Sequence, residues 1–308
     1  VAVFPSVYHM PLNSSVNVSI MALIPAGIYA KGSDVTLSWD NDAQIPDQGA
    51  PTEGSFFSSA GQSFFAVNPL SGSSVRVNQS LLSSGGVGNT SLPYVGTLFM
   101  MNYKGMAAGT STLTLSGVQL RNPSNIAITP VDLHPPGGVQ LIVDGTAPTV
   151  ASVLIHNASI DNDNYVKNTD NITITATVTD DAALTASEIT ANLSGFSLGV
   201  AVNPSSYASN VATWTLNNVV CNPANGTITV AVAAADLAGN SGSSSDNIIA
   251  DNTAPTVATG LTAKVVSPGG HEKVTLNWTT GTDDNYRGVV IRYNTWTYPT
   301  YGGAEPTA

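Results

Sequence analysis

The sequence predicts an all-β chain that is built from tandem β-sandwich domains. Apolar and polar residues alternate along many short segments, as they do in strands that bury one face. Residues 144–150, with the sequence DGTAPTV, return almost unchanged as DNTAPTV at residues 251–257, 107 residues further along. Because a sandwich domain has about 100 residues, the repeated phrase marks junctions and predicts domains at 1–145, 146–252 and 253–308.

The first predicted domain shows strands over residues 16–24, 35–39, 113–120 and 139–143. The alternation changes phase at Ser116-Gly117, and one extra residue at that point predicts a β-bulge. The residues expected on the buried faces are Val16, Val18, Ile20, Ala22, Ile24, Val35, Leu37, Trp39, Leu113, Leu115, Val118, Leu120, Val139, Leu141 and Val143.

The second predicted domain shows strands over 172–178, 212–216 and 228–234. Alanine is frequent over 231–238, but Val and Ile at alternate positions favour a strand over a helix. The buried residues expected here are Ile172, Ile174, Ala176, Val178, Ala212, Trp214, Leu216, Ile228, Val230, Val232 and Ala234.

The third predicted domain is only half as long as a sandwich. Strands are expected over 261–265, 274–278 and 289–293. Half a sandwich exposes an apolar face and unpaired strand edges. We therefore expect either that the natural chain continues beyond residue 308 or that strands from another subunit complete this domain.

The composition narrows the classes of function. Only 9% of the residues are charged and the formal net charge is −11, which disfavours nucleic-acid binding, since the phosphate backbone requires clustered Lys and Arg. No apolar run approaches the roughly 18 residues of a membrane span. Cys221 is the only cysteine, so no intrachain disulfide is expected, and an exported protein without disulfides is typical of prokaryotic cell surfaces. The chain begins with Val1, from which we expect a removed signal segment or a fragment of a longer protein.

The acidic residues predict calcium binding. The chain has 16 Asp and only 4 Glu, and Asp is a loop residue whose carboxylate suits Ca²⁺. We expect calcium at the strand ends of the second domain, with Asp180, Asp181, Asp236, Asn240 and Asp251 as ligands, where it would stiffen a domain junction. Two further acidic groups are 161–164 and 40–42, and neither has EF-hand spacing. The alternative is that these Asp and Asn side chains form Asx-turns.

No enzymatic site is predicted. Residues 195–199 match the G-x-S-x-G pattern of hydrolases, but that motif requires a following helix and a suitably placed His, so we interpret it as a strand flanked by glycines and not as a catalytic Ser197. The four histidines are far apart in the sequence, which disfavours a zinc site. Trp39, Trp214 and Trp278 are in register with the buried faces and are expected in cores, whereas Trp296 is a candidate contact residue.

Several segments of the first domain resemble the cohesin family. The likeness lies in residues 12–20, 35–40, 96–100, 109–115 and 137–143. The resemblance implies a jelly-roll β-sandwich that docks partner modules or serves as a scaffold domain. Residues 41–95 are longer and richer in Ser and Gly than in that family, so only the fold is carried over and not the dockerin-binding face.

The other two domains resemble modules of exported prokaryotic proteins. Residues 146–252 resemble a bacterial immunoglobulin-like domain through residues 146–148, 177–181 and 235–240. Residues 253–308 are similar to the front of a fibronectin type III domain through 274–278 and 288–293. These resemblances imply spacer and adhesive modules.

Together these observations predict a non-enzymatic extracellular structural or adhesive protein. It would belong to a cell-surface, matrix or filament assembly and self-associate by strand complementation or bind other surface proteins. The alternative is a protein- or polysaccharide-binding module that acts through residues 1–145, or the non-catalytic part of a larger secreted hydrolase.

Overall fold

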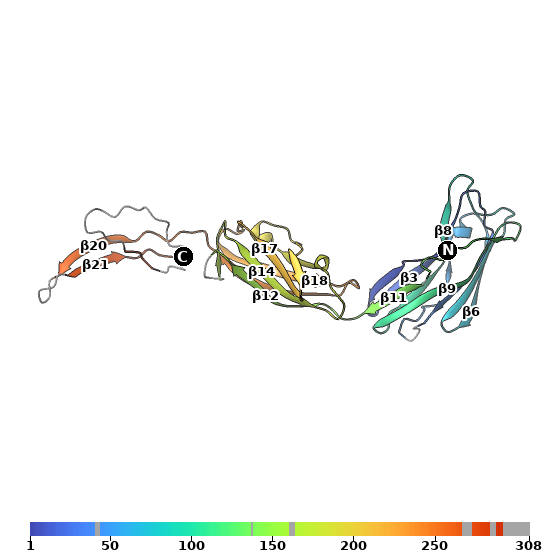
Figure 1. Ribbon diagram of the computed structural model, residues 1–308, viewed down its shortest axis with the longest axis horizontal. Helices are drawn as coiled ribbons and strands as arrows, with labels where there is room; N and C mark the ends of the chain where they lie inside the picture. The colour runs from blue at the N-terminus through green and yellow to red at the C-terminus, as the bar shows by residue number, and fades with distance from the viewer. Residues whose placement is uncertain (41–43, 137, 160–163, 267–272, 284–287, 292–308) are drawn as a thin grey trace. The chain divides into compact units, whose positions relative to one another are not determined.

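A computed structural model describes residues 1–40, 44–136, 138–159, 164–266, 273–283 and 288–291 of the chain. Strands form nearly all of its regular structure (Figure 1). The helical segments are single turns, namely α1 (Ser55–Ser58), η1 (Ala186–Glu188) and η2 (Ser194–Phe196). The prediction of an all-β chain with tandem β-sandwiches is confirmed.

The chain divides into two compact units. The first contains Val1–Thr149 together with the loops Thr179–Leu184 and Ala234–Gly242. The second contains Val150–Val178, Thr185–Ala233 and Ser243–Ala308. The domain boundaries at 145/146 and 252/253 stay predictions.

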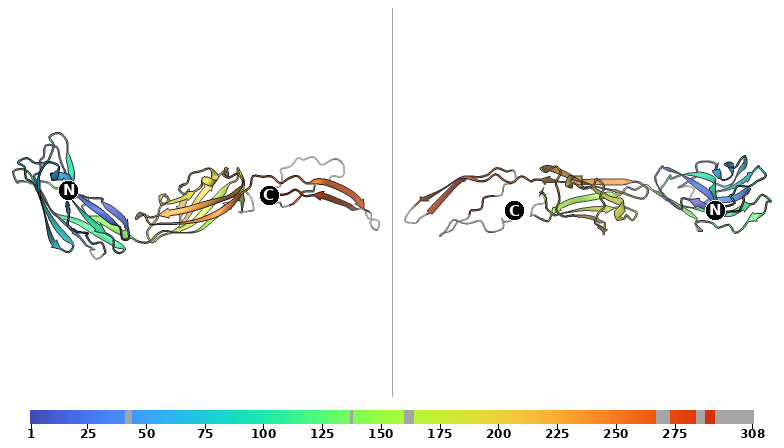
Figure 2. Two further views of the ribbon diagram at one scale, coloured as in Figure 1. Left: turned by 180° about the vertical axis from the view of Figure 1, so that it is seen from behind. Right: turned by 90° about the horizontal axis from the view of Figure 1, so that it is seen from above.

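The strands β1–β11 form the two sheets of the first sandwich (Figure 2). One sheet has the order β1-β3-β8-β5, and the other has the order β2-β11-β9-β4-β7-β6 with β10 beside β9. β2 runs parallel to β11. The strands are β1 (Ala2–Phe4), β2 (Val7–Pro11), β3 (Ser15–Ile24), β4 (Gly32–Trp39), β5 (Thr52–Glu53), β6 (Ser63–Ser71), β7 (Ser74–Leu81), β8 (Tyr94–Lys104), β9 (Gly109–Arg121), β10 (Ala127–Ile128) and β11 (Val139–Asp144).

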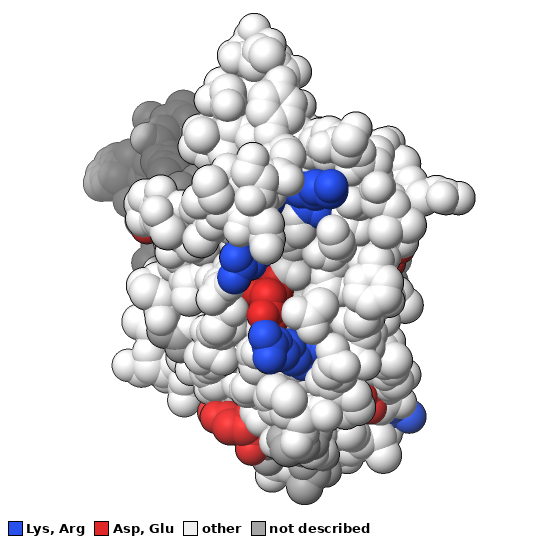
Figure 3. Space-filling model, turned by 90° about the vertical axis from the view of Figure 1, so that its right-hand side faces the viewer, with Lys and Arg blue, Asp and Glu red and all other residues white. Residues whose placement is uncertain are grey.

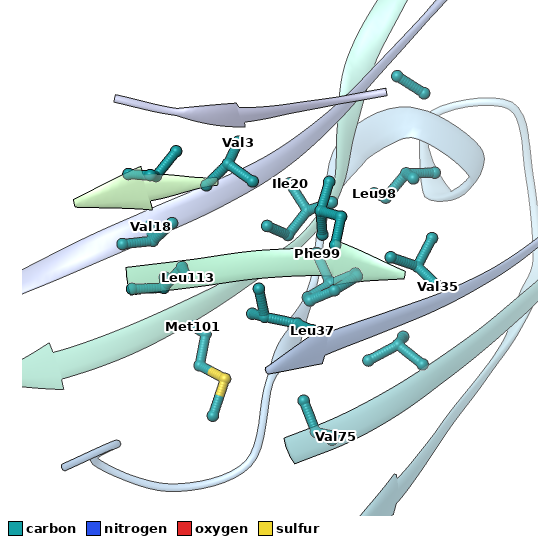
Figure 4. Close-up of a cluster of buried hydrophobic side chains, with 14 of the residues drawn as sticks. Val3, Val18, Ile20, Val35, Leu37, Val75, Leu98, Phe99, Met101 and Leu113 are labelled. Carbon is teal, nitrogen blue, oxygen red and sulfur yellow. The ribbon is translucent and has the colours of Figure 1, made fainter. Parts of the chain in front are cut away.

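The core of the first sandwich lies between these sheets. Figure 4 shows Ile20 from β3 and Leu37 from β4 near Phe99 from β8, with Val18 and Val35 on opposite sides of this group. The alternation expected on β3, β4 and β11 is confirmed, because each predicted inward residue on these strands is buried. Burying one face of the long strands β3, β4 and β11 contributes hydrophobic stabilisation to the sandwich.

The predicted β-bulge in β9 is present. Thr36 of β4 pairs with Ser116, whereas Asp34 pairs with Gln119, so Val35 alone faces the two residues between them. Gly117 has φ +57°, a left-handed conformation that glycine adopts at low cost. The bulge therefore restores the inward direction of Leu120 after the change of phase.

The strands β12–β19 form two four-stranded sheets, with orders β12-β14-β17-β16 and β13-β19-β18-β15. The expected inward residues of β14 and β18 are buried, as is Trp214 of β17, and 226–235 is a strand, as predicted. The strands are β12 (Thr149–Asn157), β13 (Tyr165–Val166), β14 (Ile172–Thr179), β15 (Ile189–Asn192), β16 (Ser206–Ala208), β17 (Val211–Leu216), β18 (Gly226–Ala235) and β19 (Ser241–Ala250).

The last described part is a two-stranded antiparallel ribbon of β20 (Thr259–Val266) and β21 (Lys273–Thr279). Trp278 is only half-buried, so its predicted place in a core is wrong. The strand expected over 289–293 is also absent from its described part, because residues 288–291 lie outside any strand. A ribbon without an opposing sheet offers neither a core for Trp278 nor a further strand partner among the described residues.

The repeated phrase has a local structural explanation. The Asp144 Oδ1 accepts a hydrogen bond of 2.9 Å from the Thr146 N–H, and the Asp251 Oδ1 accepts one of 2.9 Å from the Thr253 N–H. Both are Asx-turns, in which a carboxylate replaces a backbone carbonyl and turns the chain at the end of a strand. The same turn therefore ends β11 and β19.

Candidate functional site

The predicted calcium ligands do not all come together. Asp180 and Asp181 follow the end of β14 and meet Asp144, the last residue of β11, in the first compact unit. One carboxylate oxygen from each of the three lies within 4.8 Å of the others, and no other such group of His, Cys, Asp and Glu occurs in the part of the chain that the structure describes. Sequence reasoning missed Asp144, although it begins the first copy of the repeated phrase.

Asp236 and Asn240 lie on a turn between β18 and β19 in the same unit. The Asn240 N–H donates to the Asp236 Oδ1 at 2.9 Å, and the Asn240 Nδ2 donates to the Asp236 Oδ2 at 2.8 Å. The same Nδ2 donates to the backbone carbonyl of Asp144 at 3.1 Å. Asn240 therefore ties this turn to the segment that carries Asp144.

Asp180 is the distinctive member of the carboxylate cluster. Both of its carboxylate oxygens are buried, and neither has a hydrogen-bond partner. Burial raises the pKa of the Asp180 carboxyl, and the charges of Asp181, Asp144 and Asp236 raise it further; the Asp181 N–H offsets part of this effect without reaching hydrogen-bond geometry. An unpaired buried carboxylate is costly unless a proton or a cation compensates it.

Asp251 does not join this cluster. It follows the end of β19, whereas Asn240 precedes the start of that strand. Ten residues of extended strand span about 33 Å, so the two residues are at opposite ends of β19. Asp251 makes the second Asx-turn instead.

The other two acidic groups lie largely outside the described residues. Residues 161–163 and 41–43 are not described. Asp40 is described, and its Oδ1 accepts a hydrogen bond of 2.7 Å from the Thr112 N–H. Trp296 also lies outside the described residues.

The G-x-S-x-G segment is not a strand, so that interpretation is wrong. Residues 194–196 form the turn η2, and Ser197 follows it with φ +58°. A Cβ on Gly195 would come within 2.4 Å of the Ile228 Cγ2, so only glycine allows this turn to pack against β18. The Ser197 hydroxyl donates to the Val220 carbonyl at 3.1 Å. A nucleophile elbow requires a helix after the serine, and the described residues that follow Ser197 contain none.

A second feature is a polar hollow of about 670 Å³ over β4, β7 and the end of β9 in the first sandwich. Three of the nine basic residues of the chain line it, namely Lys31, Arg76 and Arg121. Figure 3 shows basic side chains on either side of an acidic one, with further acidic side chains toward the lower edge of the same face. This hollow concentrates positive charge in a strongly acidic chain.

The side chains of the hollow are held in place. Arg76 forms an ion pair with Asp34 and donates from its Nε to the Asp34 Oδ1 at 2.8 Å. This hydrogen bond and the charge of Asp34 raise the pKa of Arg76. Arg121 donates to the Gln119 Oε1 at 2.8 Å and to the Asn125 carbonyl at 3.0 Å. Phe64 lies beside them with an exposed ring.

Two further observations concern the whole described chain. None of its helices has the length and the apolar character that crossing a lipid bilayer demands. Cys221 is a buried free thiol, and burial raises its pKa.

Comparisons with known proteins give a likeness in structure alone. No family model matches the chain, and no curated protein matches it. A non-cellulosomal cohesin from the archaeon Archaeoglobus fulgidus is 16% identical with a TM-score of 0.36, over 47% of this chain and 89% of its own. A type II cohesin dyad from the ScaA scaffoldin of Acetivibrio cellulolyticus is 13% identical with a TM-score of 0.37, over 80% of this chain and 76% of its own.

A cohesin from Clostridium acetobutylicum is 11% identical with a TM-score of 0.35, over 46% of this chain and 89% of its own. These solved structures are cohesin domains, the family that the first domain was expected to resemble. At such identities and TM-scores no residue role or partner is transferred to this chain. The immunoglobulin-like and fibronectin type III resemblances stay predictions.

Proposed function

We propose that this chain is a non-catalytic, exported structural protein that associates with a second copy of itself through the β20–β21 ribbon. The observation that carries the proposal is the one-sided apolar character of this ribbon. Val265 faces Val274 and Ala263 faces Leu276 across the pair, so their side chains share one face. The other face carries polar residues such as Lys264 and Thr275.

The apolar face is open to solvent. Leu261, Val265 and Val274 are 70%, 63% and 64% exposed. Burying a fully exposed side chain of this size contributes about 1.5–3 kcal/mol. Because about two thirds of each side chain is still exposed, the three together offer roughly 3–6 kcal/mol against the cost of association. Two isolated strands are marginal in water and need a covering layer.

We propose a second copy of the chain as the partner that covers the apolar face of the ribbon. Two identical amphipathic ribbons are self-complementary under a two-fold axis, and packing their apolar faces together would form the two layers of a small sandwich. This arrangement would cover the apolar face of the ribbon with strands from another subunit. Repetition along a surface would give a structural or adhesive assembly.

Light scattering after size-exclusion chromatography, at chain concentrations up to about 1 mM, tests this proposal. The wild-type chain is expected to dimerise or form larger species. The variant Val265→Ser with Val274→Ser should shift the chain to monomer, since both changes fall on the apolar face. The control Thr262→Ser with Thr275→Ser alters the opposite face and should associate like the wild type. A wild-type chain that stays monomeric throughout would refute the proposal.

The polar hollow supports a second candidate function, a binding module for acidic polysaccharide. The guanidinium groups of Arg76 and Arg121 suit carboxylates, neighbouring amides suit hydroxyl groups, and the exposed Phe64 ring offers a stacking surface. Electrophoresis of the full chain through gels that contain an acidic or a neutral polysaccharide tests this idea. Arg121→Ala should abolish retardation by the acidic polymer, whereas Lys264→Ala, an equal loss of charge on β20, should leave it unchanged.

A further inference from the structure

The carboxylate cluster does not depend on the self-association proposed above and carries its own inference. Asp144, Asp180 and Asp181 reach one place from two segments that are 36 residues apart in the sequence. Ligands that share one Ca²⁺ lie 2.3–2.6 Å from the ion, so two of them are separated by at most about 5 Å. The separation of 4.8 Å or less among these oxygens satisfies that limit.

The environment of the Asp180 carboxylate is a second, independent observation that indicates a bound cation. Its two oxygens are shielded from water and accept no hydrogen bond. The negative charges of Asp144 and Asp181 repel that of the desolvated Asp180 carboxylate. Without a counter-charge, this repulsion opposes a fold that holds the three carboxylates together. The only ion pair among the described residues joins Arg76 and Asp34, so no described Lys or Arg neutralises the cluster. A bound cation would supply the missing counter-charge.

The donor atoms define the class of cation. All three side chains offer carboxylate oxygen, and no imidazole or thiolate is present in the group. Oxygen ligands select hard cations over zinc or copper. Ca²⁺ accepts irregular geometry with six to eight oxygens, whereas Mg²⁺ requires a nearly ideal octahedron. Carboxylates from the end of one strand and the loop after another fit the more tolerant ion.

The geometry points to a calcium site formed by Asp144, Asp180 and Asp181, in which Asp180 offers two shielded carboxylate oxygens that lack a hydrogen-bond partner. Asp236, whose carboxylate is held by Asn240, adds negative charge next to this site. Asp251, an expected ligand, is not part of it. The ion would join the end of β11 to the loop after β14 within the first compact unit.

Isothermal titration of the full chain with CaCl₂, after removal of metal with a chelator, tests the site. One Ca²⁺ per chain is expected, with a Kd of about 10⁻⁴–10⁻³ M, the range of extracellular modules. MgCl₂ at the same ionic strength should bind more weakly. Calcium should also raise the temperature of unfolding, which provides a second readout.

Matched variants separate a specific site from a general effect of charge. Asp180→Asn should weaken calcium binding about tenfold or more, because it removes a ligand charge. Asp246→Asn removes the same charge from β19, where the Asp246 Oδ1 accepts only a local hydrogen bond from Asn247, and should bind like the wild type. Asp181→Asn, at an exposed position, provides the same test if Asp180→Asn does not fold.

Three results would overturn the inference. The first is the absence of both binding heat and a shift in the unfolding temperature at about 5 mM Ca²⁺, which is well above the expected Kd. The second is equal weakening of calcium binding by Asp180→Asn and Asp246→Asn. The third is Mg²⁺ binding that is as tight as Ca²⁺ binding. Loss of calcium binding would leave the oligomeric state of the chain unaffected, so the failure of this inference is distinct from the failure of self-association.

Discussion

Gln79 provides the sharpest test of how the first sandwich is held together. It lies on β7 in phase with the buried residues Val75, Val77 and Leu81, and it is only 3% exposed. Its Nε2 donates to the carbonyl of Leu98 on the opposite sheet at 2.7 Å, while its Oε1 accepts from the Ser33 hydroxyl at 3.2 Å. One polar side chain therefore links the two sheets through an apolar core.

The cost of removing Gln79 can be worked from these contacts. Gln79→Ala loses the bond between the sheets, about 1 kcal/mol, and leaves the nearly buried Ser33 hydroxyl without its acceptor, about 1 kcal/mol more. The cavity left by the side chain adds about 1–2 kcal/mol. The total loss of unfolding free energy is about 3–4 kcal/mol. Gln79→Met keeps most of the volume and should cost about 1–2 kcal/mol, since Leu98 still accepts from the Gly54 N–H at 2.8 Å.

Calorimetry of the full chain measures both variants. In a unit of 150–250 residues, 1 kcal/mol shifts Tm by about 2–4 °C, so Gln79→Ala should lower the transition of the first sandwich by roughly 10 °C and Gln79→Met by roughly 4 °C. Asn78→Ala, on the solvent face of the same strand, should shift it by less than about 2 °C. A Gln79→Met variant less stable than Gln79→Ala, or equal shifts for Asn78→Ala and Gln79→Ala, would refute this reasoning.

Three further predictions follow from local structure. Gly117→Ala should lower the free energy of unfolding, measured by urea denaturation, by about 1 kcal/mol, because the φ of +57° at this position is unfavourable for alanine. The control Gly85→Ala should be neutral, since a Cβ at Gly85 would point into open space. Equal effects of the two variants would contradict the bulge. The Cys221 thiol, 6% exposed and with a raised pKa, should react with iodoacetamide at neutral pH only after unfolding, and rapid native labelling would show that it is accessible. Ser197, whose hydroxyl donates to the Val220 carbonyl, should give no adduct with a sulfonyl fluoride by mass spectrometry; an adduct would reopen the hydrolase interpretation.

Period-2 alternation predicted the strands because it reports a property of each strand alone. Val16 to Ile24 and Ile172 to Val178 bury the expected residues, and even the bulge at Gly117 was visible as a change of phase. The alternation does not report whether an opposing layer exists. Trp278 was therefore assigned to a core from its register, although the ribbon that carries it has no covering sheet among the described residues. Gln79 shows the opposite case, since its register predicts burial and only its cross-sheet partner explains why a polar residue is tolerated there.

The carboxylate cluster shows why a site built from loops is harder to predict than a strand. The sequence groups Asp180, Asp181, Asp236, Asn240 and Asp251 because all five follow or precede strands. Whether two loops meet depends on the end of the sheet at which each strand stops, and this follows from the pairing order. β14 ends where β12 begins, so the partner of Asp180 is the Asp of the first repeated phrase, Asp144, and the equivalent Asp251 is one strand length away. The two copies of the phrase therefore differ in their surroundings, because only the Asp of the first copy, Asp144, lies beside Asp180 and Asp181.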